Sequence, residues 1–309
     1  MLVTVIALAI APVASRGVPD PGPAGATPTS PGAGAAAAAP AAPESSATAD
    51  PATPSGDAAL DDSPAPDSLG FGRWVDEEEL KRFAKVPWRI GEYFQFSIDW
   101  NGLNGGSSLM QVQNLQRVAG RRAYRIVSKT ESNSFVSKFY KVRDRAESYI
   151  DAESLYTLRF IKHLREGGYK SDVDIRFDQA NRKAAYSDGK TFDVAAGVHD
   201  VLSAFYYIRT RPLPDGATMV VPTHDNKKSY EMEVKVHKRE RIEVPAGKFN
   251  CVLVEPILKS EGVFKSKGSI LVWLTDDERR MPVLVRTKVP VGSINVALTD
   301  YRLFFERKK

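Results

Sequence analysis

Two adjacent aspartates in residues 275–280 (TDDERR) form the densest group of side chains that could act as acid and base. General acid and base roles need two carboxyls in different environments, so that their pKa values differ. Asp276 and Asp277 instead lie side by side in a turn between two apolar runs, WL and MPVLV. The flanking arginines favour the ionised form of both carboxylates. The pattern therefore predicts a solvated turn without a catalytic residue.

Other residue types that perform acid–base chemistry or bind metals are sparse. The four histidines, at positions 163, 199, 224 and 237, lack ligand spacing, and no nucleotide-binding loop, GxSxG or HExxH motif occurs. His199 and Asp200 are sequence neighbours on a predicted helix and do not face each other. The single cysteine, Cys251, lies in the apolar run FNCVLVEP, which is typical of a small core residue. We expect no catalytic residue, no metal site and no cofactor.

Residues 198–210 (VHDVLSAFYYIRT) have the apolar spacing of an amphipathic helix. His199 and Asp200 fall in its first turn, where the helix dipole favours a carboxylate. Pro212 and Pro214 follow and end it. The apolar residues that define its face are Val198, Val201, Leu202, Phe205 and Ile208.

This helix also carries aromatic and basic residues that could bind an anionic amphiphile. Its rings could line an opening, and its guanidinium groups could bind a phosphate or carboxylate. A further candidate lies in the basic segment 141–145 (KVRDR), where pairing of the arginine with Asp144 is the structural alternative. The candidate ligand contacts are Phe205, Tyr206, Tyr207, Arg209, Arg211 and Arg143. The simpler alternative is a helix that only completes the core.

Most of residues 91–304 alternates between apolar and polar residues, the period of a β-strand. Residues 101–106 (NGLNGG), 188–189 (DG) and 245–247 (PAG) predict turns. Charged residues on one strand face, such as Glu231 and Glu233, argue against an outer-membrane barrel. We predict a mainly β fold: a curved antiparallel sheet or incompletely closed barrel of about a dozen strands, with one central amphipathic helix.

The first seventy residues differ in composition from the rest. Residues 1–15 resemble a signal peptide, with an apolar run and small residues before a cleavage site, although no basic residue precedes the run. The run is too short to span a bilayer. Residues 16–68 are rich in Ala and Pro and lack aromatic residues, which predicts a disordered linker. Residues 69–309 then form a single β-rich domain that starts with a short helix at 76–85, and no transmembrane span is expected.

Charge divides at the same boundary. Residues 1–69 hold one basic and seven acidic residues, whereas the remainder holds 42 basic and 31 acidic residues, a net charge of +11. A basic domain favours anionic partners such as lipids, glycans or nucleic acid, or simply has a solvated basic surface. Export argues against nucleic acid. The basic segment 235–241 (KVHKRER) also lacks the interleaved aromatic residues that stack on bases.

Five segments resemble the bacterial domain of unknown function 3108. They are IGEYFQFSIDWNGLNGGSSLMQV, SKFYKVRDRAESYID, VHDVLSAFYYIRTRPL, IEVPAGKFNCVLVEP and KGSILVWLTDDERRMPVLVRTKVPVGSINVALTDY, and they occur in the family's order over about residues 90–305. The resemblance implies an exported β-rich domain of the Gram-negative envelope. It implies no activity and supplies no catalytic residue.

These observations favour a non-enzymatic binding or carrier module in the periplasm or another exported compartment of the Gram-negative envelope. Its ligand would be a lipid-like or other anionic amphiphile held between the sheet and the helix. The alternative is a structural or assembly factor that binds an envelope protein or an anionic glycan through its basic face. An enzyme would require carboxylates that converge from distant strands.

Overall fold

The computed structural model describes residues 81–258, 270–288 and 292–303. Within these residues, one α-helix, α3 (Val201–Arg209), and one 3₁₀-helix, η1 (Val136–Lys138), accompany fourteen strands. The strands are β1 (Tyr93–Trp100), β2 (Leu103–Val118), β3 (Arg121–Ser132), β4 (Arg143–Asp151), β5 (Thr157–Glu166), β6 (Tyr169–Asp178), β7 (Lys183–Tyr186), β8 (Thr191–Asp193), β9 (Thr218–Asp225), β10 (Lys228–Val244), β11 (Gly247–Leu258), β12 (Ile270–Thr275), β13 (Pro282–Lys288) and β14 (Ser293–Arg302). The predicted signal peptide (1–15), the linker (16–68) and residues 76–80 of the predicted short helix (76–85) lie outside the described residues. In the described half of that segment, only Lys81 is helical.

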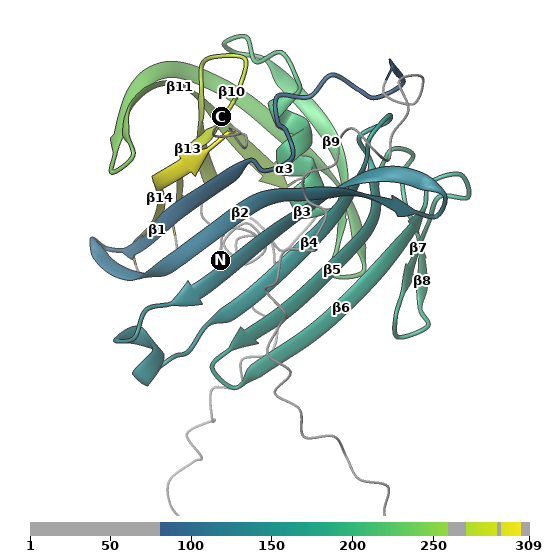
Figure 1. Ribbon diagram of the computed structural model, residues 1–309, viewed down its shortest axis with the longest axis horizontal. Coiled ribbons are helices and arrows are strands. Elements are labelled where there is room, and N and C mark those ends of the chain that lie inside the picture. The colour runs from purple at the N-terminus through teal and green to yellow at the C-terminus, as the bar shows by residue number, and fades with distance from the viewer. Residues whose placement is uncertain (1–80, 259–269, 289–291, 304–309) are drawn as a thin grey trace, which may run out of the picture. The chain divides into compact units, whose positions relative to one another are not determined.

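All fourteen strands belong to one antiparallel sheet in the order β8-β7-β6-β5-β4-β3-β2-β1-β14-β13-β12-β11-β10-β9. Strands β1 to β8 form one meander and β9 to β14 form a second, and the pairing of β1 with β14 joins them. The sheet curves on itself, as Figure 1 shows, but its two edge strands, β8 and β9, are not hydrogen-bonded neighbours. The predicted mainly β fold with an incompletely closed sheet and one α-helix is confirmed.

Side chains connect the two edges of the sheet in place of a β-ladder. The hydroxyl of Tyr186 on β7 lies 2.9 Å from Nε2 of His224 on β9, and it accepts a hydrogen bond from the backbone of Lys227. His199, just before α3, forms a parallel bridge with Thr223 on β9. The Tyr186 contacts therefore join β7 to β9 and to the turn that follows it.

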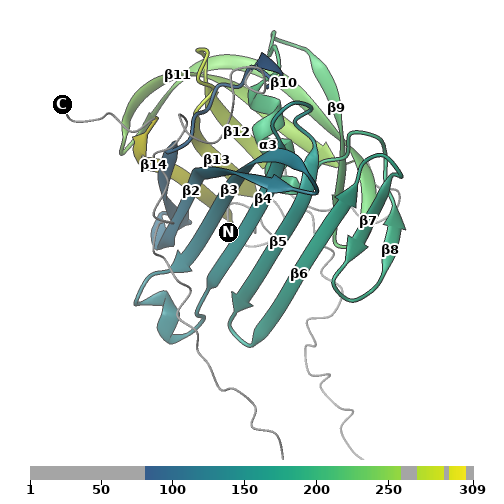
Figure 2. The ribbon, with the colours of Figure 1, turned by 45° about the vertical axis from the view of Figure 1, so that its right-hand side comes forward.

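The helix lies within the curve of the sheet, against β4 and β9 (Figure 2). It begins at Val201, three residues later than the sequence pattern predicts. Asp200 has an extended backbone, and its carboxylate accepts hydrogen bonds from the amides of Leu202 and Ser203, so it is the N-cap. Val198 and His199 bond to neighbouring strands instead. The prediction that His199 and Asp200 form the first helical turn was therefore wrong.

The turn predicted at residues 101–106 is shorter in the structure. Only Asn101 and Gly102 form it, with φ values of 48° and 84°, as a two-residue hairpin requires. Strand β2 starts directly afterwards and includes Gly106, where a Cβ atom would lie 2.2 Å from the carbonyl oxygen of Glu131 on β3. This glycine therefore permits the close approach of β2 and β3. By contrast, the turn predicted at residues 188–189 does join the paired strands β7 and β8.

Candidate functional site

Arg209, a predicted ligand contact, lies in the core at the end of α3. Its guanidinium donates two hydrogen bonds of 2.8 Å to the carboxylate of Glu92, and both side chains are at most 1% exposed. It also donates to the backbone carbonyls of Arg279 and Arg280, at 3.1 and 3.0 Å. Burial raises the pKa of Glu92, although the charge and hydrogen bonds of Arg209 oppose that rise. Glu92 therefore already binds the guanidinium of Arg209 inside the core.

The other predicted ligand contacts do not form one site. Phe205 and Tyr206 are buried in the core, whereas Tyr207 is half-buried and Arg211 is exposed, with its guanidinium 5.5 Å from the Tyr207 ring. The structure thus places two of the three aromatic rings inside the core and not around an opening. Arg143 is exposed at the start of β4, with Nε 3.7 Å from a carboxylate oxygen of Glu131.

Arg143 lies far along β4 from the part of the strand that contacts the helix. Ser148, which bonds to the helix N-cap, lies five residues further along β4, or roughly 16 Å at the usual rise of a strand. The six predicted residues therefore remain predictions as ligand contacts, and the structure does not gather them.

A buried polar network holds the first turn of α3 to the sheet. The Asp200 carboxylate accepts hydrogen bonds from Ser148 (2.6 Å) and Thr157 (2.8 Å), and Thr157 lies 2.5 Å from the hydroxyl of Ser203. Ser203 is in turn 3.2 Å from Nδ1 of His199. Burial raises the pKa of Asp200 despite these bonds, and burial lowers the pKa of His199 to about 4.

The Ser203–His199 contact has the residue types of a nucleophile and a base. However, both side chains are buried, and Ser203 is shared between Thr157 and the backbone oxygen of Asp200. A catalytic serine needs access to substrate and a base that is free to take its proton. The network instead satisfies buried polar groups, which positions the helix on β4 and β5.

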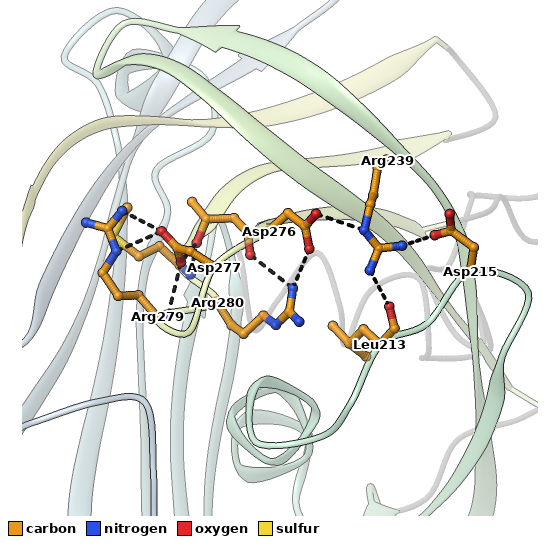
Figure 3. Close-up of polar contacts among 9 residues, drawn as sticks. Leu213, Asp215, Arg239, Asp276, Asp277, Arg279 and Arg280 are labelled. Carbon is orange, nitrogen blue, oxygen red and sulfur yellow. Dashed lines mark hydrogen bonds and ion pairs between the residues drawn. The ribbon is translucent and has the colours of Figure 1, made fainter.

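The acidic turn between β12 and β13 is a set of ion pairs, as Figure 3 shows. Asp276 accepts hydrogen bonds from Arg239 (2.8 Å) and Arg280 (3.0 Å), and Asp277 accepts one of 2.8 Å from Nε of Arg279. Burial acts to raise both carboxyl pKa values, but the hydrogen bonds and charges of the arginines outweigh it and lower them. Both aspartates are therefore ionised at neutral pH, as predicted, and neither holds a proton to donate.

The outer face of the sheet on β3 to β6 is basic but largely paired. Glu147 accepts hydrogen bonds from Arg125 (2.9 Å) and Arg145 (2.7 Å), and Arg159 binds Asp174 at 2.6 and 2.9 Å. Burial would raise the pKa of Glu147, but its two arginines lower it. These arginines are already matched with carboxylates. The predicted interaction with a glycan or envelope protein through a basic face remains a prediction.

The inner face of the sheet carries a patch of small side chains, which we define as Ser108, Ser128, Thr130 and Ala146. Cross-strand pairing places Ser108 opposite Thr130 and Ser128 opposite Ala146, so the four side chains form a block on β2, β3 and β4. The Ser108 hydroxyl lies 3.0 Å from that of Thr130. Such side chains fill less of the enclosed volume than the phenylalanines on neighbouring β1.

Beside this patch lies a buried charged pair. Lys162 on β5 is the cross-strand neighbour of Ala146, and its ammonium donates to Asp225 (2.8 Å) and Asn226 (3.2 Å). Both members of the Lys162–Asp225 pair are at most 3% exposed. An ammonium has three donors, and these contacts use two of them.

A third polar group on the inner face is the hydroxyl of Tyr230. Tyr230 is opposite Thr223 in the pairing of β9 with β10, and its hydroxyl is buried without a hydrogen-bond partner among the described residues. Burial raises the pKa of this phenol well above its usual value, and the charges of Asp225 and Asp200 add to the rise. Tyr230 is therefore a neutral, buried donor. We call Ser128, Ala146, Lys162, Asp225 and Tyr230 the inner site.

Sequence reasoning missed the inner site, although one signal was present. In β5, Lys162 has the same parity as Phe160, which is buried, so a lysine occupies a position of the apolar face. A charged residue at such a position must find a buried partner. The sequence does not show that partner, because Asp225 lies 63 residues away in the other meander.

The described residues contain no cluster of three or more His, Cys, Asp or Glu side chains able to hold a metal ion. Cys251 is buried in the core, as predicted, and burial raises the pKa of its thiol to about 12. Among the same residues, no helix has the length and apolar character needed to cross a membrane.

Three solved structures match the chain at low sequence identity. A β-barrel-like protein of domain of unknown function DUF1849 from Brucella abortus has a TM-score of 0.53 at 9% identity, and the match covers 72% of this chain and 100% of that one. A candidate lipoprotein from Parabacteroides distasonis gives 0.33 at 12% identity, over 71% and 99% of the two chains. An exported protein with a YmcC-like fold from Bacteroides fragilis gives 0.30 at 12% identity, over 71% and 99%.

The likeness to the DUF1849 protein concerns the fold alone, because the two chains are only 9% identical. No curated protein matches the chain. A family model, described as protein of unknown function (DUF3108), matches residues 95–299, which span strands β1 to β14. The resemblance seen in the sequence is therefore confirmed, and the chain belongs to the DUF3108 family.

Proposed function

We propose that the protein is a non-enzymatic binding or carrier module of the bacterial envelope, and that its ligand is a lipid-like, anionic amphiphile. The observation that carries the proposal is the inner site, where small side chains adjoin a buried lysine on an inner face that also carries a buried, unbonded tyrosine hydroxyl. Ligand sites of this class are mostly apolar, with a few polar groups that fix the orientation of the ligand.

The Tyr230 hydroxyl supports a polar ligand group at this position. A buried hydroxyl without a partner costs about 1–3 kcal/mol, which an accepting oxygen of a ligand would recover. In this proposal the remaining donor of Lys162, whose ammonium is bound to Asp225, binds the same ligand. A carboxylate or phosphate oxygen accepts from both donor types.

The small-residue patch supports the apolar part of the ligand. An alkyl chain over Ser128 and Ala146 would fill the space that larger side chains occupy on β1. In this proposal the Arg209 guanidinium does not bind the ligand, since it is bound to Glu92. The envelope location rests on the signal-peptide pattern of residues 1–15 and on the resemblance described above.

Lipid extraction and native mass spectrometry of the purified full chain test this proposal, together with titration of a fluorescent fatty acid. Ala146→Phe should fill the small-residue patch and reduce fatty-acid affinity by roughly tenfold or more. The matched control is Ala185→Phe on β7, an exposed position that should leave the affinity unchanged. Thermal melting of each variant reports whether it is folded.

Tyr230→Phe keeps the proposal testable if Ala146→Phe fails to fold, because it removes only the hydroxyl. We expect a loss of affinity of about fivefold or more, the value of one hydrogen bond. Purified protein without bound lipid, together with a folded wild type that does not bind the fatty acid, would refute the proposal. Equal affinities of wild type, Ala146→Phe and Tyr230→Phe would place any binding elsewhere.

A further inference from the structure

The end of the sheet away from α3 is formed by three neighbouring connections. They are the β1–β2 turn (101–102), the β3–β4 connection (133–142), which contains η1, and the β5–β6 turn (167–168). Backbone hydrogen bonds run from the amide of Asn133 to the oxygen of Gly105, near the start of β2 (3.0 Å), and from the amide of Gly167 to the oxygen of Lys141 (2.8 Å). Figures 1 and 2 show these connections together at one end of the sheet.

Exposed apolar side chains concentrate at these connections. Of the seven large hydrophobic side chains that are exposed in the described residues, six lie here, and the seventh is Val220 on β9. We define the tip surface by the four most exposed of them: Leu103 (73%), Phe135 (67%), Phe139 (80%) and Tyr169 (57%). The rings of Phe135 and Phe139 lie 5.8 Å apart, so the two form a single aromatic projection. Such a concentration marks an interaction site.

The charges around the tip surface favour an anionic partner. The β3–β4 connection contributes two exposed lysines, Lys138 and Lys141, and none of the three connections contains an acidic residue. Arg143 and Lys170, at the adjoining strand starts, are exposed as well, although Glu131 lies near Arg143. Aromatic side chains prefer the interface between water and lipid, and nearby lysines are attracted by anionic lipids.

We propose that the tip surface docks the domain on an anionic phospholipid bilayer. Phe135 and Phe139 enter the interface between head groups and acyl chains, and Lys138 and Lys141 contact lipid phosphates. Projections from three separate connections suit an extended, flat partner better than a single bound molecule. This inference goes beyond the proposed inner site and does not depend on it, because the tip side chains lie on the outside of the molecule.

Vesicle flotation of the purified full chain tests the docking surface. Wild type should float with vesicles of phosphatidylethanolamine and phosphatidylglycerol, and much less with vesicles of phosphatidylcholine alone. The double variant Phe135→Ser/Phe139→Ser should lose about tenfold or more in partition coefficient, because two exposed rings no longer enter the interface. Val220→Ser is the matched control, since it removes an exposed hydrophobic side chain elsewhere and should float like wild type.

A charge-reversed variant separates the electrostatic part of docking. Lys138→Glu/Lys141→Glu should weaken flotation with phosphatidylglycerol vesicles, and added salt should reduce the difference from wild type. Arg241→Glu, an exposed position on β10, is the control and should behave as wild type. All of these positions are exposed, so the variants should melt as wild type does.

Several results would overturn docking on a bilayer. Wild type could fail to float with phosphatidylglycerol vesicles, or Phe135→Ser/Phe139→Ser could float unchanged. A wild-type dimer in light scattering that becomes a monomer in this variant would make the tip surface a contact between two copies. Fatty-acid binding by the same variants should remain that of wild type, so that failure of docking and failure of the inner site are told apart.

Discussion

Replacing Arg209 or Glu92 tests whether the predicted ligand residue Arg209 is a structural anchor. The pair is isolated from water, with side chains at most 1% exposed, and the guanidinium makes two hydrogen bonds to the carboxylate and two to backbone carbonyls. It also lies 4.9 Å from the centre of the Tyr206 ring. Arg209→Met removes all of these contacts, whereas Glu92→Leu removes only the carboxylate.

The expected cost follows from what each change leaves behind. Removing one partner of a buried ion pair leaves the other charge uncompensated, which costs about 3–5 kcal/mol. Arg209→Met also leaves the carbonyls of Arg279 and Arg280 without this donor, so its cost should be about 4 kcal/mol or more. In the double variant no charge remains buried. Its cost should therefore be roughly 2–4 kcal/mol less than the sum of the two single costs.

Urea denaturation of wild type, the two single variants and the double variant measures this coupling. If the double variant loses as much free energy of unfolding as the two single variants together, within about 0.5 kcal/mol, the two side chains act independently. A cost of Arg209→Met below about 1 kcal/mol would show that water reaches the guanidinium. Either result would refute the assignment of Arg209 as a structural anchor and would favour its predicted role as a ligand contact.

Three further predictions concern the helix and the acidic turn. Burial lowers the pKa of His199 to about 4 in the folded state, below its usual value of about 6.5. As pH falls, His199 therefore gains a proton in the unfolded chain before it does so in the folded chain, which favours unfolding. Between pH 7 and 5, the free energy of unfolding of wild type should therefore fall by about 2 kcal/mol through this residue, as measured by urea denaturation. It should fall less in His199→Gln, and the same pH dependence in both proteins would contradict the prediction. Asp200→Ala removes the helix N-cap and should lower the free energy of unfolding by about 2–3 kcal/mol in the same assay. Asp276→Asn, in the exposed turn, should lower it by less than about 1 kcal/mol. Equal losses would contradict the assigned roles. Phe205→Asp places a charge in the core and should cost about 4 kcal/mol or more by thermal melting, so an unchanged melting temperature would show a solvent-exposed helix face.

The fold was largely readable from the sequence because its strands alternate. In β1, for example, Phe94, Phe96 and Ile98 all lie on the inner face, as the period of two requires. The helix was placed from its apolar spacing, but its start was not, because His199 pairs with β9 before the helix begins. That pairing joins two distant segments, and local spacing carries no information about it.

The candidate site was less predictable, since it depends on contacts across the sheet. Arg209 at a helix end resembles an exposed cation in the sequence, and only the fold brings Glu92 to it from 117 residues away. Lys162 and Asp225 meet in the same way, between the two meanders. Sequence spacing predicts which face a side chain takes, whereas the partner of a buried charge depends on the closure of the sheet.

Photo-crosslinking with a fatty acid that carries a diazirine on its alkyl chain tests the central claim, ligand binding at the inner site, most directly. After illumination of the purified full chain, mass spectrometry of its peptides locates the labelled residues. We predict labels on inner-face residues of β3 and β4 around Ser128 and Ala146, with loss of these labels in Ala146→Phe but not in Ala185→Phe. Labels confined to the outer face or the tip surface, or the same inner-face labels in Ala146→Phe as in wild type, would contradict it.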